Sequence, residues 1–306
     1  MADLLTPFAA FVLGAALARA NSCTVASARR LVFERRPDWL IGLGIAIGWA
    51  GLTMTIFAIV LPEVVKLPAQ FPLTWQLAAG GVLLGIGATI NQGCFLGSVA
   101  RLGRGDLGYA LTLLGIALAM ALKVEWQPWL LSQNPMESKV ALRPPGELFS
   151  AGMIFLPIAL FGLWRWLRRR RPTVLALIVV GIAGGTVYAC NPDWSYSSGL
   201  YRVVANGAHP QALLAESGAI AVLAGVAVNA MFGRSFDLRL PSARIVLARL
   251  SGGLLMGSGA LLVPGGNDTL MLWSIPGLTL YGLVAYGVML ATITGLLVGH
   301  RALSTR

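Results

Sequence analysis

Charged residues are scarce in this sequence: they make up 11% of its 306 residues, whereas hydrophobic residues make up 57%. An average soluble domain carries about 25% charged residues, so this chain has too little polar surface to cover a soluble globule. The shortage argues against a soluble enzyme, a nucleic-acid-binding protein and a disordered chain. We therefore expect an integral membrane protein that is embedded in the lipid bilayer. We do not expect it to bind nucleic acid.

Cysteine and histidine are also scarce, with three and two copies. Three widely spaced cysteines do not form a disulfide framework, and without a Cys-x-x-Cys motif a disulfide-exchange enzyme is disfavoured. A structural zinc site takes about four ligands in clustered spacing, and His209 and His300 lie in or near predicted loops. We therefore expect no metal site and no cofactor.

About nine apolar stretches are long enough to cross a bilayer, which takes about 20 residues. They cover residues 5–28, 38–61, 74–100, 107–122, 147–164, 172–189, 212–232, 248–268 and 276–299. Polar or helix-breaking residues interrupt the first, third and eighth stretches. The sequence thus predicts an all-α integral membrane protein of about nine transmembrane helices.

The basic residues predict how these helices are oriented. Of the 23 Lys and Arg residues, 17 follow odd-numbered stretches, among them the run Arg168–Arg171 and four arginines between Arg234 and Arg249. Cytoplasmic connections of membrane proteins carry an excess of Lys and Arg. We therefore predict an N-terminus outside and a C-terminus in the cytoplasm, with the long polar connection 123–147 on the external side.

Two Gly-rich segments, 80–94 and 252–266, match at a spacing of 172 residues, and a weaker match relates the first stretch to the sixth. Because matching stretches run in opposite directions across the membrane, the sequence predicts two inverted repeats, 1–122 and 172–306. Segment 123–171, an external loop plus a linking transmembrane helix, joins them. Inverted repeats with interrupted helices are typical of transporters, whose substrate sites lie near the breaks.

Four breaks interrupt the predicted helices, at Asn21–Thr24, Asn91–Cys94, Cys190–Asp193 and Pro264–Asp268, and all three cysteines lie in them. Non-helical backbone at membrane depth is tolerated where it is buried or lines a cavity. A helix that restarts after a break offers free backbone N–H groups and the positive end of its dipole, which suits an anion.

The candidate substrate-binding residues are the three thiols, the polar and glycine residues of the breaks, and one nearby arginine. They are Cys23, Cys94, Cys190, Asn91, Gln92, Gly93, Asn191, Gly266, Asn267 and Arg19. A neutral thiol is a weak, polarizable donor, which suits a soft sulfur-containing anion without trapping it.

Two charged residues near the breaks each have two interpretations. Arg19 precedes Cys23 by four residues, which predicts a shared helical face; it either supplies charge at a pathway mouth or extends to the membrane interface. Asp268 is either a group that caps or bonds the local backbone or a site of proton coupling.

The most specific pattern runs from Gly85-Ile86-Gly87-Ala88 through Gly93-Cys94 to Arg101-Leu102-Gly103, and Ser22-Cys23-Thr24 forms a second. Both resemble motifs of the YeeE/YedE family of sulfur-compound transporters, and the resemblance covers nearly the whole chain. It implies an hourglass-shaped permease of the bacterial inner membrane that takes up thiosulfate, with Cys23 and Cys94 along a central path. A cytosolic sulfurtransferase that receives the anion is a further implied partner.

The sequence departs from the family pattern at Gly265-Gly266-Asn267, where relatives often have Gly-Gly-Cys. The alternatives are therefore a transporter of selenium or another sulfur compound, or a membrane-embedded sulfur-transfer enzyme that carries a persulfide on Cys94. The sequence has no plausible base near any cysteine, which disfavours the enzyme. We expect a transporter rather than an enzyme, with a small sulfur-containing anion as its substrate.

Overall fold

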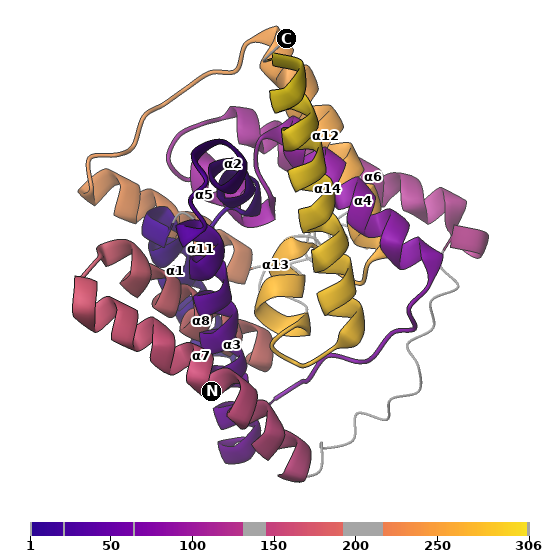
Figure 1. Ribbon diagram of the computed structural model, residues 1–306. Coiled ribbons are helices and arrows are strands. Elements are labelled where there is room, and N and C mark those ends of the chain that lie inside the picture. The colour runs from indigo at the N-terminus through magenta and orange to yellow at the C-terminus, as the bar shows by residue number, and fades with distance from the viewer. Residues whose placement is uncertain (1, 21, 64, 131–144, 192–216, 305–306) are drawn as a thin grey trace.

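The chain is built from helices in a computed structural model that describes residues 2–20, 22–63, 65–130, 145–191 and 217–304 (Figure 1). Seven helices in these ranges are long and apolar enough to cross a membrane, and two further apolar helices are shorter. The same ranges contain no β-strand, only an isolated bridge between Asp106 and Arg239. An all-α, multi-pass membrane protein is thus confirmed, whereas the count of nine spans and the hourglass shape stay predictions.

The long helices agree closely with the predicted apolar stretches. They are α1 (Ala2–Ala20), α3 (Asp38–Val60), α4 (Trp75–Asn91), α6 (Gly108–Leu130), α7 (Pro145–Arg169), α8 (Pro172–Cys190), α11 (Ser217–Phe232), α12 (Ala243–Leu262) and α14 (Leu280–Ser304). Breaks after α1, α4 and α12 lead into the short helices α2 (Thr24–Glu34), α5 (Phe95–Leu102) and α13 (Asn267–Thr269), the last continuing as a π-helix over Leu270–Ser274. The remaining predicted break starts at the end of α8 and runs on outside the described ranges.

One boundary differs from the prediction. Helix α6 continues to Leu130, so the first part of the connection predicted over 123–147 is helical. The predicted apolar stretch ended at residue 122, directly before Lys123 and close to Glu125. Lys and Glu are good helix formers, so a change in polarity there marks where the apolar stretch ends and not where the helix ends.

The helices gather into two bundles (Figure 1). The first bundle holds α1, α3, α7, α8 and α11, and the second bundle holds α4, α6, α12 and α14. Each bundle therefore takes helices from both halves of the chain. The short helices connect the two, because α2 packs on both α3 and α14, and α5 packs on α1, α6 and α11. The broken helices thus meet where the bundles adjoin.

Glycines allow α4 and α12 to pack backbone against backbone. A Cβ placed at Gly87 would lie 2.7 Å from the carbonyl oxygen of Gly252, and one placed at Gly80 would lie 3.0 Å from that of Gly259. The lower number on α4 is paired with the higher number on α12, so these helices run antiparallel. Small residues give such close approach in membranes, where burial of apolar surface does not drive helices together.

Two contacts bring the ends of several helices to one edge of the structure. Arg165 near the end of α7 pairs with Asp38 at the start of α3, with 3.3 Å between Nη2 and Oδ1. Arg301 near the end of α14 donates a hydrogen bond to the carbonyl of Val32 near the end of α2. We name this edge, formed by the ends of α2, α7 and α14 and the starts of α3 and α8, the basic edge.

Helices α1 and α11 also pack backbone against backbone, and a substitution at their contact tests this packing. A Cβ at Gly14 would overlap the carbonyl oxygen of Val222, and a Cβ at Gly225 would overlap that of Phe11. We expect Gly14→Ala to force the helices apart and to destabilise the protein by about 1–3 kcal/mol, measured as a lower thermal unfolding midpoint in detergent. Gly287→Ala is the matched control, because a Cβ at Gly287 meets nothing within 4 Å; equal midpoints for both variants would contradict the packing.

Candidate functional site

Two of the three predicted thiols lie together between the bundles. Cys23 is the N-cap of α2 and Cys94 is the N-cap of α5, and their sulfur atoms are 3.7 Å apart. Both side chains are buried and neither forms a side-chain cap bond to its helix. The first backbone N–H groups of a helix have no partner within it, so two sets of donors and two positive dipole ends lie beside the thiol pair.

Gly97 leaves the space that the Cys23 thiol occupies. A Cβ placed at Gly97 would lie 2.6 Å from the sulfur of Cys23 and 3.7 Å from that of Cys94. The close pairing of the thiols therefore depends on the absence of a side chain at Gly97.

Asn91 holds the break that presents Cys94. Its side-chain nitrogen donates to the carbonyl of Gly93 at 2.7 Å and to the hydroxyl of Ser98 at 2.8 Å, and its oxygen accepts from the hydroxyl of Thr112 at 2.7 Å. These bonds join the end of α4 to α5 and α6. The predicted binding residue Asn91 thus has an evident positioning role, and its contact with substrate stays a prediction.

The next two residues complete this turn. Gln92 adopts a left-handed backbone conformation (φ 54°) and is exposed, whereas the thiols are buried. Gly93 is buried, and a Cβ there would lie 3.2 Å from the ring of Tyr109. Gln92 reverses the chain direction, and Gly93 allows the turn to pack on α6.

The break after α12 comes next to this turn. Gly266 is the N-cap of α13, and the side-chain oxygen of Asn267 accepts a hydrogen bond from the backbone N–H of Phe95 at 2.9 Å. The side-chain nitrogen of Asn267 is buried and has no hydrogen-bond partner among the described residues. A buried amide without a partner is costly, and a substrate contact of this N–H₂ group stays a prediction. Asn267 and Gly266 thus lie at the start of α5, next to the thiol pair.

Asp268 connects this break to α8. Its Oδ2 accepts a hydrogen bond from the hydroxyl of Tyr188 at 3.1 Å, and that hydroxyl lies 3.2 Å from the hydroxyl of Thr269. The side chain of Asp268 is fully buried. It therefore bonds a side chain of a neighbouring helix, an interaction that neither interpretation of the sequence included.

Cys190 lies apart from the other thiols as far as the described contacts go. It ends α8, two residues after Tyr188, and is buried. Asn191 is the C-cap of α8, and its backbone N–H donates to the carbonyl of Val187 at 2.8 Å. Among the residues that the structure describes, no hydrogen bond joins Cys190 to Cys23 or Cys94. A path that includes all three thiols therefore stays a prediction.

The predicted relation between Arg19 and Cys23 is wrong. Helix α1 ends at Ala20 and α2 begins at Thr24, so the two residues do not share a face of one continuous helix. Arg19 is exposed, and its Nε donates to the side-chain oxygen of Asn229 at 3.0 Å. Both interpretations of its charge stay open after this correction.

Two arginines approach Tyr109, whose ring packs on Gly93 just before the start of α5. The guanidinium of Arg101 donates to the Tyr109 hydroxyl at 2.6 Å, and that of Arg249 lies 4.0 Å from the centre of its ring. Arg249 was counted with the basic residues of the connection before the stretch 248–268, but it is buried within α12, which begins at Ala243. The residues before it are good helix formers, so the helix begins before the apolar stretch. Positive charge therefore lies close to the break before α5, because the Tyr109 hydroxyl that Arg101 bonds is on the ring that packs against Gly93.

Beyond Tyr109 is a hollow of about 400 Å³, which we name the basic vestibule. Its lining residues are Arg101, Arg104, Asp106, Ser235, Asp237 and Arg239. Connections from both halves of the chain pair here: the N–H of Asp237 donates to the carbonyl of Arg104, and that of Arg239 to the carbonyl of Gly105, each at 2.9 Å.

The charges in the vestibule interact with one another. Burial lowers the pKa of the Arg104 guanidinium, and the charge of Arg101 lowers it further. The hydrogen bond and the charge of Asp237 raise the pKa of exposed Arg239. Arginine stays protonated in proteins, so the vestibule carries three positive charges against two negative ones.

Sequence reasoning missed several residues that shape the site, namely Ser98, Thr112, Tyr109, Tyr188 and Arg249. Each is a polar side chain within or beside an apolar stretch, and each is buried. Polar residues in membrane helices are expensive unless bonded, so this signal was present in the sequence. It did not say which side chains bond to which.

Comparison of the chain with known protein families agrees with this geometry. An all-α membrane protein whose broken helices meet between two bundles has the architecture of a membrane transporter. The family model for sulphur transport matches residues 19–295, so the chain belongs to that family, and the predicted membership of the YeeE/YedE group is confirmed. A search of the curated proteins finds no match. The groups of His, Cys, Asp and Glu that the structure describes include none suited to a metal ion.

The thiol pair predicts a response to oxidation. We expect an added oxidant such as copper phenanthroline, which takes two electrons while two protons are released, to join Cys23 to Cys94, because the sulfur atoms need to approach by less than about 2 Å to reach bonding distance. Mass spectrometry of the digested protein reports the cross-link. Cys190 serves as the internal control and should stay reduced; random pairing among all three cysteines would contradict the geometry.

The glycine beside the thiols predicts a second outcome. Gly97→Ala should displace the Cys23 side chain and slow that cross-link, because the new methyl group would overlap the sulfur. Gly44→Ala is the matched control, since a Cβ at Gly44 meets nothing within 4 Å. Unchanged cross-linking in Gly97→Ala would show that the thiols are not held as described.

Proposed function

We propose that this sulfur-compound transporter is an inner-membrane permease that carries thiosulfate inward past Cys23 and Cys94. The observation that carries the proposal is the pair of buried thiols 3.7 Å apart at the N-terminal ends of two short helices. The thiol sulfur atoms add soft contacts, and helix N-termini favour an anion. The site thus offers a sulfur oxyanion both a sulfur surface and N–H donors.

The side-chain nitrogen of Asn267 supports the same proposal. It is a buried donor without a partner among the described residues, and the oxygen of the same amide already bonds the N–H of Phe95. An anion at this position would accept from Asn267 and from the first turn of α5. Dehydrating an anion is costly unless donors replace its water, and these groups replace part of it.

We further propose that the two halves of the chain are inverted repeats related by a pseudo-twofold axis. The spacing of 172 relates Gly80 to Gly252 and Gly87 to Gly259, and the observed contacts pair Gly80 with Gly259 and Gly87 with Gly252. Each contact is therefore the image of the other under the repeat. Phe95 and Asn267 are 172 residues apart and bond to each other, which supports an axis close to the thiol pair.

The anion would leave through the basic vestibule. Arg101 lies on α5, two turns after Cys94, and lines the vestibule with Arg104 and Arg239. The positive-inside rule places these connections in the cytoplasm, so the positive charge favours inward movement of an anion. A cytosolic sulfurtransferase that receives thiosulfate at this mouth is a further part of the proposal.

Growth tests the substrate directly. A bacterium that lacks sulfate uptake should grow on thiosulfate as its only sulfur source when it expresses this chain and not otherwise. Absence of rescue by protein confirmed in the membrane would count against thiosulfate, and rescue on a selenium compound alone would favour the alternative substrate.

Uptake by cysteine variants tests the path. We expect Cys23→Ala and Cys94→Ala each to lower thiosulfate uptake about tenfold, the value of one lost hydrogen bond to a charged ligand. Cys190→Ala is the matched comparison, since it removes a buried thiol outside the pair. Normal uptake in the variant without any cysteine would contradict a role for the thiols, and a persulfide on Cys94 during turnover would favour the enzyme.

A further inference from the structure

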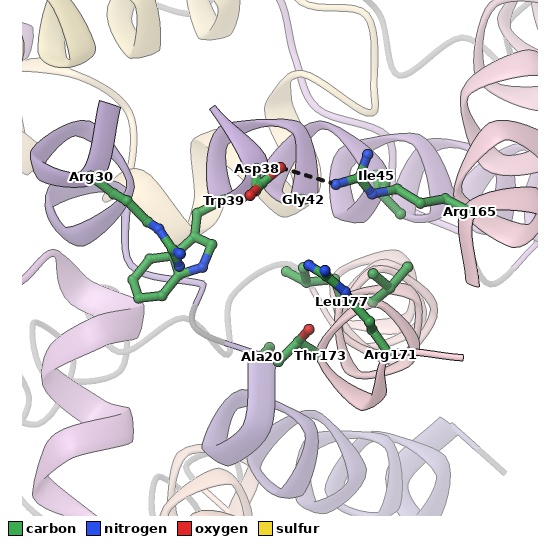
Figure 2. A pocket seen from close by; sticks show the side chains of 11 residues that line it. Ala20, Arg30, Asp38, Trp39, Gly42, Ile45, Arg165, Arg171, Thr173 and Leu177 are labelled. Atoms are coloured by element: carbon green, nitrogen blue, oxygen red, sulfur yellow. Dashed lines mark hydrogen bonds and ion pairs between the residues drawn. The ribbon is translucent and has the colours of Figure 1, made fainter. Parts of the chain in front are cut away.

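A second, smaller cavity lies at the basic edge. It has a volume of about 70 Å³, well above the roughly 10–15 Å³ that one water needs. Figure 2 shows it between the starts of α3 and α8 and the side chains that reach it from α2 and α7. The residues that line it are Ala20, Arg30, Asp38, Trp39, Gly42, Ile45, Arg165, Arg171, Thr173, Val174 and Leu177.

Three guanidinium groups from three different helices surround this cavity. Arg30 comes from α2, Arg165 from α7, and Arg171 is the N-cap of α8 (Figure 2). Asp38 is the one acidic residue of the lining and pairs with Arg165 at 3.3 Å. The lining thus carries three positive charges and one negative charge, which favours an anion.

Arg171 is the cation that has no carboxylate of its own. Arg165 has Asp38, and Arg30 pairs with Glu34 at 3.0 Å. The residues that the structure describes give Arg171 no ion pair, and its side chain does not cap α8. The start of α8 adds backbone N–H groups that lack partners within the helix, next to the hydroxyl of Thr173.

The surroundings indicate the source of the anion. Helices α2 and α7 end here and α3 and α8 begin here, so the cavity lies at a membrane surface. Arginines cover tryptophan rings along this edge: Arg30 lies 4.7 Å from the ring centre of Trp39, and Arg168 lies 5.0 Å from that of Trp164. Trp and Arg gather at the level of lipid headgroups, and basic pockets between helices bind anionic headgroups.

We propose that this cavity binds the phosphate group of an anionic membrane lipid. The phosphate would accept from Arg171 and from the start of α8, with Arg30 and Arg165 on either side. Its acyl chains would lie along α7, whose outward side chains, such as Phe161 and Trp164, are exposed and apolar. The bound lipid would join α2, α3, α7 and α8 at their ends. This inference does not depend on the identity of the transported anion.

Native mass spectrometry of the full-length protein in detergent, titrated with dioleoyl-phosphatidylglycerol, tests the site. We expect Arg171→Gln to weaken phosphatidylglycerol binding about fivefold, the effect of one basic residue at a membrane surface. Arg169→Gln is the matched control, because it removes a neighbouring exposed charge that does not line the cavity. Equal weakening by both variants, or by neither, would overturn the proposal.

Two further arms distinguish a specific lipid site from a damaged fold and from a site for a soluble ion. Asp38→Asn removes the negative charge from the lining, so it should strengthen phosphatidylglycerol binding, whereas simple damage to the fold would weaken it. Inorganic phosphate and dioleoyl-phosphatidylcholine are titrated in parallel and should bind more weakly than phosphatidylglycerol. Equal binding of inorganic phosphate would assign the cavity to a soluble ion and overturn the lipid assignment.

Discussion

A helix that stops inside a membrane leaves backbone N–H and C=O groups that no water can satisfy, and this constraint shapes the centre of the protein. Two asparagines meet part of the demand. Asn91 bonds the turn that follows α4, and Asn267 bonds the first N–H of α5. The remaining donors at the helix starts lie beside Cys23 and Cys94. The groups that are hardest to accommodate in lipid are thus gathered where an anion can use them.

The interleaving of the two halves of the chain determines where the broken helices and the thiol pair lie. Each bundle contains helices from both halves, so the breaks of both halves come together at the boundary between the bundles. Cys94 and Cys23 are buried there, and the positive groups of Arg101 and Arg249 lie next to Tyr109, whose ring packs on Gly93. The thiol pair and the positive charge of Arg101 are therefore close to each other, because the ring of Tyr109 packs on Gly93 beside Cys94 and its hydroxyl accepts from Arg101.

The sequence predicted the helices well because long apolar stretches and helix breakers are local signals. The breaks after α1, α4 and α12 were found in this way, as were both thiols of the pair. The distance between Cys23 and Cys94 was not predictable, because 71 residues separate them and only the packing of α5 on α1 and α11 brings them together. Charge patterns grouped Arg249 with a connection and ended the stretch of α6 too early, since polarity marks the membrane surface and not the end of a helix. The partner of Asp268 was missed for a related reason: Tyr188 looks like an ordinary apolar-helix residue until the fold places it beside the carboxylate.

The hydrogen bond between Asn267 and Phe95 also has a consequence for the synthesis and membrane insertion of the protein. The acceptor is made 172 residues after the donor, and a ribosome adds about 5–20 residues per second. The first turn of α5 therefore waits about ten to thirty seconds in the membrane before its partner exists. During that interval neither bundle is complete, since α12 and α14 have yet to enter. Until then the backbone N–H of Phe95 lacks the acceptor that it has in the complete fold.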